Sequence, residues 1–135
     1  MSEIFTHQAS ALQEKKPIIF TALSKKYFYM RFHIVKFVLE QGGVPINPFT
    51  SYDYFLLDTV DRDVIRNANN NLVNLADELW VFGSISNGVL AETLHVKSTG
   101  RPIRYFELVN DRECKEISKE ELVFEDGLEK FRNEL

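Results

Sequence analysis

The chain has one cysteine, Cys114, and no long hydrophobic run. A single cysteine excludes an intrachain disulfide framework and any zinc site built from several cysteines. The apolar runs reach about five residues, whereas a helix needs roughly 20 to cross a bilayer. The first 16 residues include Glu3 and Glu14, so they are not expected to form a secretory signal. These absences predict a cytoplasmic protein with no membrane partner.

The chain also lacks an excess of basic charge. Its 16 Lys and Arg against 20 Asp and Glu give a net charge of −4. Binding to DNA or RNA requires a basic footprint, so no nucleic-acid partner is expected. His7, His33 and His95 are scattered without the spacing of metal ligands. We therefore expect no metal and no other cofactor.

Proline and glycine are few, at 4 and 6 residues, and they fall at the joints of the expected elements. No stretch resembles a linker, and no internal repeat is present. A chain of 135 residues fits one domain. A domain of this size buries roughly two-thirds of its unfolded surface, which is enough to fold without a disulfide or metal. We expect a single domain over residues 1–135, with a core at 17–106 and an accessory charged tail at 107–135.

The core alternates apolar runs with helical spacing. The run at 18–23 is continuous and short, which is typical of a strand buried on both faces. Residues 27–41 have helical periodicity, and Gly42 and Gly43 follow as a C-cap. The expected buried face of this helix comprises Phe28, Phe32, Val35 and Leu39, with Ile34 and Val38 beside them.

The same alternation continues to residue 106. Strands are expected at 44–46, near an edge of the sheet, and at 79–82 and 102–106, with helices at 60–76 and 88–99. Thr59 or Asp58 is the expected cap of the helix at 60–76. A loosely held helix is expected within 1–15, and the tail should add a small strand at 123–124 and a helix from 126. The order predicts a three-layer α/β/α sandwich around a parallel, flavodoxin- or Rossmann-like sheet of four to five strands.

Ligands of such sheets bind at the carboxyl ends of the strands. There, Asn87 is the expected N-cap of a helix that carries Glu92 in its first turn, while Gly88 lets the backbone approach a ligand. The helix dipole should keep Glu92 ionised near neutral pH. An ionised carboxylate can attack a sugar C1 or stabilise an oxocarbenium ion. The alternative is that Glu92 is only a favourable first-turn acid on a surface helix.

Asp61 is a second candidate acid. Ile65, Ala68 and Leu72 follow it at helical spacing, so Asp61 should head the buried stripe and point into the site. The alternative is an acid that only caps the helix. The asparagine-rich run at 67–74 is expected to be a solvated face. Asp77, at the opposite edge of the sheet, is expected to be structural.

Four further side chains are candidates for ligand binding. Tyr52 and Tyr54 could stack on a base or could instead form a hydrophobic lid. Arg31 and Lys26 follow the first strand and could hold a phosphate, although the loop lacks the glycine-rich cradle of a Walker motif.

Three segments resemble the nucleoside 2-deoxyribosyltransferase-like superfamily. They are Ala-Asp-Glu-Leu-Trp-Val-Phe-Gly at 76–83, Asn-Gly-Val-Leu-Ala-Glu at 87–92 and Gly-Arg-Pro-Ile-Arg-Tyr-Phe at 100–106. The resemblance implies cleavage or transfer at an N-glycosidic bond, with Glu92 as nucleophile and Asp61 orienting it. Ser86, Asn87 and Gly88 would contact the substrate, a nucleoside or nucleotide.

The resemblance also implies a homo-oligomer, because related members complete their sites across subunits. Two alternatives to the enzyme stay open. One is a module of signalling or defence that senses a nucleotide without turning it over, and the other is an oligomeric subunit whose aromatic faces only build contacts between chains.

Overall fold

The computed structural model describes residues 3–52, 56 and 59–135 and contains a five-stranded sheet. The strands lie in the order β2-β1-β3-β4-β5, and only β5 is antiparallel to its neighbour. This is the strand order of flavodoxin-like sheets. The strands are β1 (Ile18–Leu23), β2 (Val44–Ile46), β3 (Glu78–Phe82), β4 (Ile103–Val109) and β5 (Glu113–Ile117).

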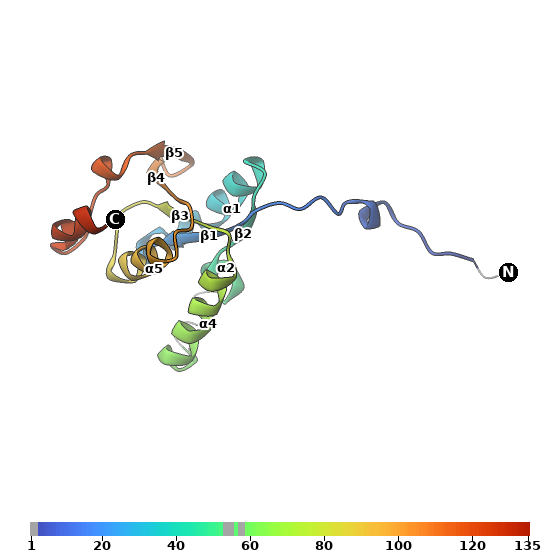
Figure 1. The fold of residues 1–135 in the computed structure, drawn as a ribbon, viewed down its shortest axis with the longest axis horizontal. Helices are drawn as coiled ribbons and strands as arrows, with labels where there is room; N and C mark the ends of the chain where they lie inside the picture. Colours follow the sequence, from blue (N-terminus) through green and yellow to red (C-terminus); the bar gives the residue numbers. More distant parts are fainter. Residues whose placement is uncertain (1–2, 53–55, 57–58) are drawn as a thin grey trace.

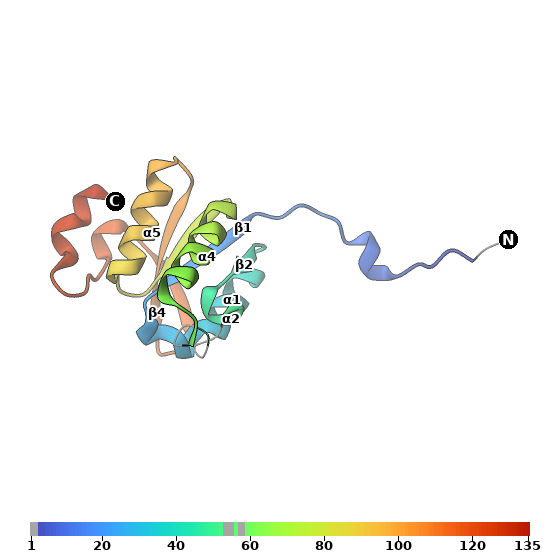
Figure 2. The same ribbon diagram turned by 90° about the horizontal axis from the view of Figure 1, so that it is seen from below.

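Helices cover both faces of the sheet. On one face α1 (Arg31–Glu40) packs through Ile34 and Val38 in a cluster that includes Phe82. On the other face α4 (Arg62–Leu75) and α5 (Asn87–Ser98) lie side by side, as Figure 2 shows. Successive side chains of a strand point to opposite faces, so β3 contributes to both clusters. The expected three-layer α/β/α sandwich is confirmed.

Short helical turns complete the described chain. They are η1 (Gln8–Ala11), η2 (Lys25–Met30), α2 (Pro48–Ser51), η3 (Lys119–Glu121) and η4 (Leu128–Glu134). At the amino end of the sheet, the Asp77 carboxylate accepts a hydrogen bond from the Ile18 backbone N–H at 2.8 Å. Asp77 therefore ties the start of β1 to the start of β3, and its expected structural role is confirmed.

The first helix differs from the expectation in its start and in its buried face. Lys25–Met30 is a 3₁₀ turn, and the α-helix begins at Arg31. Phe32 and Leu39, expected to be buried, are 63% and 58% exposed, whereas Ile34 and Val38 are fully buried. Both sets of residues fit helical spacing, so periodicity alone could not choose between them.

The tail contains a hairpin that was not expected. β4 and β5 are joined by residues 110–112, of which Asn110 and Asp111 have a positive φ, and these residue types tolerate that backbone conformation. The expected small strand is a single parallel bridge between Ile85 and Phe124. The expected last helix is a 3₁₀ turn that starts at Leu128.

The amino-terminal segment extends away from the body (Figure 1). Within residues 3–15 the only regular structure is the 3₁₀ turn η1, and every side chain there is exposed. The short, loosely held helix expected here is therefore present only as this four-residue 3₁₀ turn, because a short helix without a packing partner is marginal in water.

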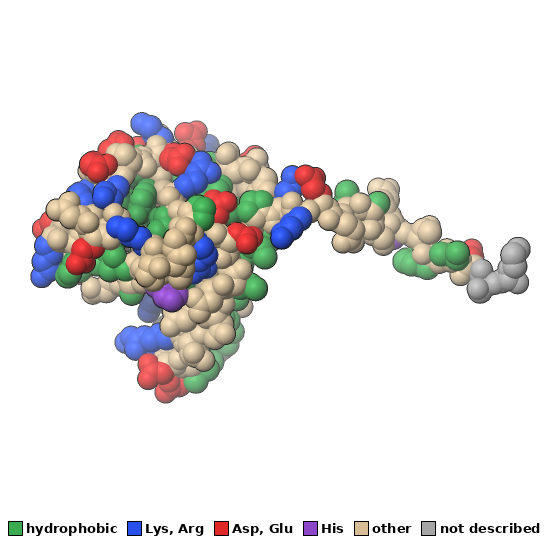
Figure 3. Space-filling view, in the orientation of Figure 1, with side chains coloured by type: hydrophobic (Ala, Val, Ile, Leu, Met, Phe, Trp, Pro, Cys, Tyr) green, Lys and Arg blue, Asp and Glu red, His purple; other side chains and the backbone are tan. Residues whose placement is uncertain are grey.

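Basic and acidic side chains are interspersed over the body on the face that Figure 3 shows. Among the helices in the described ranges, none is both long and apolar enough to cross a membrane.

Candidate functional site

A cavity of about 840 Å³ opens at the carboxyl ends of β1 and β3. From β1 the chain crosses to β2 on one side, and from β3 it crosses to β4 on the other, so this is the switch point of the sheet. Ligands of open α/β sheets bind at such a point. β1, α4 and α5 form most of the wall, and α2 and the tail contribute the rest.

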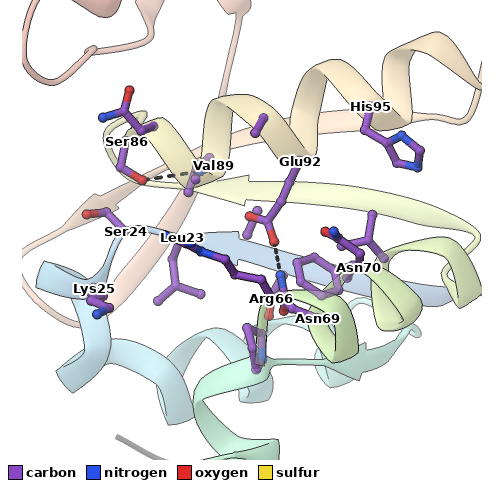
Figure 4. A pocket seen from close by; sticks show the side chains of 18 of the residues that line it. Leu23, Ser24, Lys25, Arg66, Asn69, Asn70, Ser86, Val89, Glu92 and His95 are labelled. Atoms are coloured by element: carbon purple, nitrogen blue, oxygen red, sulfur yellow. Dashed lines mark hydrogen bonds between the residues drawn. The ribbon is translucent and has the colours of Figure 1, made fainter. Parts of the chain in front are cut away.

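Glu92 lies on the cavity wall and points across from α5 toward α4 (Figure 4). The Asn69 side-chain N–H donates a hydrogen bond of 2.7 Å to Glu92 Oε2. The carboxyl keeps part of its surface open to the cavity, yet burial among protein atoms raises its pKa from 4.5 to about 7, while the Asn69 hydrogen bond acts in the opposite direction. The expected first-turn position is wrong, since Glu92 is in the second turn of α5, and desolvation outweighs the expected dipole effect.

The amino end of α5 forms another part of the wall. Ser86, Asn87 and Gly88 all line the cavity, as their expected role in binding requires. The N-cap is Ser86 and not Asn87: its hydroxyl accepts a hydrogen bond from the Val89 N–H at 3.4 Å. The helix begins one residue earlier than the glycine suggested, so Asn87 is its first residue.

Asp61 does not join Glu92. It is exposed, it does not line the cavity, and it is the N-cap of α4, where its carboxylate accepts the Asp63 N–H at 2.9 Å. The expectation that Asp61 is buried is therefore wrong, and so is the expected cap at Thr59 or Asp58. The stripe of Ile65, Ala68 and Leu72 is partly buried as expected, but its buried part begins one turn after Asp61.

Part of the asparagine run lines the cavity, whereas Asn67 and Asn71 are exposed as expected of a solvated face. Asn69, Asn70 and Asn74 line the wall together with Arg66. The far end carries His95, whose Nε2 lies 2.7 Å from Asn74 Oδ1. Asparagine is a poor helix former, so several asparagines in one helix were the available sign of a function beyond folding.

Asn69 also has an open hydrogen-bonding position. Its Oδ1 is buried and has no hydrogen-bond partner within the part of the chain that the structure describes. A buried carbonyl oxygen without a partner costs free energy. A ligand that offers an O–H or N–H group to this oxygen would remove that cost.

The remaining candidates lie elsewhere. Tyr52 is half-buried and does not line the cavity, and Tyr54 lies outside the described residues. The Arg31 guanidinium stacks on the Phe28 ring, 3.8 Å from its centroid, and Lys26 forms an ion pair with Glu125. Neither cation lines the cavity. Lys25 of η2 and Phe49 of α2 do line it.

The tail also reaches the cavity, which sequence reasoning missed. Glu125 and Asp126 line it. The nearest sequence signal was the small strand expected at 123–124, which the bridge to Ile85 places beside the start of α5. In the described ranges, no group of three His, Cys, Asp or Glu side chains is placed to hold a metal ion.

Comparison with known proteins adds one match. A family model described as a domain of unknown function (DUF7768) matches residues 23–106, which is more than half of the chain. No curated protein and no solved structure gives a significant match. The matched range includes Asn69, Ser86 and Glu92, and it excludes Glu125.

Proposed function

The chain belongs to the DUF7768 family, a domain of unknown function, and we propose that it binds a nucleoside or nucleotide and cleaves or transfers at the N-glycosidic bond. The observation that carries this proposal is the Glu92 carboxyl, held by Asn69 at the wall of the switch-point cavity. The resemblance of residues 76–83, 87–92 and 100–106 to deoxyribosyltransferase-like proteins supports the same chemistry.

The cavity is of the right size and character for such a ligand. Small-molecule sites commonly enclose about 300–1,000 Å³ and combine apolar walls with a few polar groups. Here Phe20, Ala22 and Phe49 supply apolar wall, while asparagine side chains from α4 supply donors and acceptors. A sugar and a base present the same mixture of apolar faces and polar edges.

Glu92 would act on the anomeric carbon. The Asn69 hydrogen bond fixes Oε2, so Oε1 would attack C1′ or stabilise the positive charge that develops there. The bond between C1′ and the base nitrogen breaks, and the base leaves with the electron pair and takes up a proton from water. Water then releases the sugar, or a second base accepts it. Because the pKa of Glu92 is about 7, the ionised form required for attack accumulates only as the pH rises through 7.

One observation favours a second function, binding without turnover. The enzyme hypothesis gave Glu92 an acidic partner, and Asp61 instead caps α4 outside the cavity. Within the described residues, the side chain that donates to the Glu92 carboxyl is the amide of Asn69. A sensor module needs the cavity and its polar wall but needs no second acid.

Chromatography of released base tests the two functions. Nucleosides, their 5′-monophosphates and NAD are incubated with the wild type, with Glu92→Gln and with the control Glu129→Gln, whose side chain is exposed and does not line the cavity. The proposal expects base release from the wild type and the control, and none from Glu92→Gln. Binding without release by the wild type would favour the sensor, and full release by Glu92→Gln would contradict the role of Glu92.

A further inference from the structure

The carboxyl-terminal tail forms part of the cavity wall. The Ile85 N–H donates to the Val123 carbonyl and the Glu125 N–H donates to the Ile85 carbonyl, both at 2.9 Å. These two bonds fix the tail to the loop between β3 and α5. They place Glu125 and Asp126 on the cavity wall, beside the first residues of α5.

A chain of hydrogen bonds holds the Glu125 side chain. The Ser84 hydroxyl donates to Glu125 Oε2 at 2.5 Å, and the Tyr27 hydroxyl donates to Ser84 Oγ at 3.1 Å. Tyr27 can reach Ser84 only because residue 83 is glycine: its φ is +81°, and a Cβ there would lie 2.4 Å from the tyrosine ring. Glu125 is therefore a positioned carboxylate and not a free surface acid.

The same carboxylate forms an ion pair with Lys26, a cation that does not line the cavity. Lys26 Nζ lies 3.4 Å from Glu125 Oε2, so the charge of Lys26 is paired. The cavity wall carries one lysine and one arginine, Lys25 and Arg66. The Arg66 guanidinium is itself paired, because it lies 3.2 Å from Asp63 Oδ1. Since Glu125 and Asp126 lie on the same wall as Lys25 and Arg66, the wall carries at least as much negative as positive charge.

This charge pattern bears on the phosphate of a nucleotide. In open α/β sheets, phosphate groups bind at the amino ends of the helices that follow the strands. In this cavity that position is the start of α5, at Ser86, Asn87 and Gly88. The tail places two carboxylates on the same wall, and like charges brought together across a binding surface oppose binding.

We infer that the cavity takes a ligand without a phosphate at this end, an unphosphorylated nucleoside in preference to its 5′-monophosphate, and that Glu125 determines this preference. The inference rests on the proposed function, because it assumes that a nucleoside occupies the cavity. Both described contacts of the Glu125 carboxylate use Oε2, and Oε1 accepts the hydrogen bond of a sugar hydroxyl.

The test compares 2′-deoxynucleosides and ribonucleosides with their own 5′-monophosphates, by base release and by calorimetric binding. The variant is the double substitution Glu125→Gln and Asp126→Asn. Glutamine keeps an acceptor for Ser84, and asparagine tolerates the positive φ of 46° at position 126. Glu129→Gln removes one exposed tail carboxylate outside the cavity and is the matched control.

The wild type and the control should favour the nucleoside by at least about tenfold, and the double variant should reduce that preference roughly 10- to 100-fold. The wild-type preference needs no variant, so poor folding of the double variant leaves the inference open to refutation. A wild type that favours monophosphates, or a double variant with an unchanged ratio, overturns it.

The two proposals can fail separately. Nucleoside-selective binding without base release would sink the enzyme and leave this inference standing. Base release mainly from monophosphates would support the enzyme and overturn the preference for the nucleoside. Binding of neither class would overturn both.

Discussion

The Asn69 amide and the Glu92 carboxyl influence each other through one hydrogen bond. Burial disfavours the ionised carboxyl and raises its pKa to about 7, while the N–H donated by Asn69 favours the ionised form and lowers the pKa. Asn69 therefore does two things: it orients Oε2, and it keeps the carboxylate accessible near neutral pH.

Replacing this amide should shift the pH at which the protein acts. In Asn69→Ala the pKa of Glu92 should rise above 7, so the midpoint of the pH profile of base release should move to higher pH, with part of the activity recovered on the alkaline side. The measurement is kcat/KM between pH 5.5 and 9. Asn71→Ala, an exposed asparagine of the same helix that bonds to the Asn67 carbonyl, is the control. An unmoved midpoint in Asn69→Ala would mean that the hydrogen bond does not set the pKa.

Single residues also mark a limit of sequence reasoning. The position of Glu92 at the ligand edge followed from the strand and helix that flank it. Its raised pKa and its Asn69 partner did not follow, because both depend on how closely α4 packs against α5. A contact between residues 69 and 92 is a tertiary fact that helical periodicity within either helix does not contain.

At the level of elements, the start of α4 decides what Asp61 can do. The Asp61 carboxylate accepts the Asp63 N–H, and the helix begins at the next residue, Arg62. A capping carboxylate is aimed along its own helix at the first backbone N–H groups. It is therefore directed away from the wall that Asn69, two turns further along α4, presents to the cavity.

Asp61→Ala should consequently affect stability and not chemistry. Loss of an N-cap lowers the free energy of unfolding by about 1 kcal/mol. Ligand affinity and base release, measured at a temperature well below the unfolding transition, should match those of the wild type. Asp61→Asn, which retains a capping oxygen, should restore most of the stability. A large loss of turnover in both variants, without a loss of stability, would return Asp61 to the candidate site.

The sequence predicted which helices and strands exist better than it predicted which helix faces are buried and at which residues the helices begin. Four strands and the order of the core helices followed from apolar runs separated by Gly42 and Gly100. The caps of α4 and α5 were misassigned because the competing residues, Asp58 and Thr59 against Asp61 and Asn87 against Ser86, all have side chains that favour an N-cap. The buried face of α1 was misassigned because two sets of its apolar residues fit helical spacing. The β4–β5 hairpin was missed although Asn110 and Asp111 are common hairpin-turn residues.

For the molecule as a whole, the two ends of the chain behave differently. The segment at 3–15 extends from the body with its side chains exposed (Figure 1). The tail, by contrast, buries Leu122 and Leu135 in the cluster beneath α5 and places Glu125 at the cavity. Composition suggested a charged accessory tail. It did not indicate that the tail completes the site, since the contacts with Ile85 join residues far apart in the sequence.

Burial of one carboxyl in the cavity wall links the site to the stability of the whole fold. In the unfolded chain Glu92 titrates at its ordinary pKa of 4.5, and in the folded protein at about 7. Below pH 4.5 the Glu92 carboxyl is protonated in both states, so its titration does not change the free energy of unfolding. As the pH rises from 4.5 to 7, the unfolded chain loses this proton first, so the folded state is progressively disfavoured. The full shift corresponds to at most about 3 kcal/mol, reached above pH 7.

Glu92→Gln removes this titration, so its advantage over the wild type should grow with pH. The free energies of unfolding of the two proteins, from denaturant titrations, should lie close together at pH 4.5 and diverge up to pH 8, with Glu92→Gln the more stable. All other titrating groups are common to both proteins and cancel in the difference. Glu129→Gln, which removes an exposed carboxylate, should show a difference from the wild type that is small and constant with pH. If the difference in free energy of unfolding between Glu92→Gln and the wild type is also constant with pH, Glu92 is as well hydrated in the cavity as in the unfolded chain. That result would also remove the reason to expect base release to rise through pH 7.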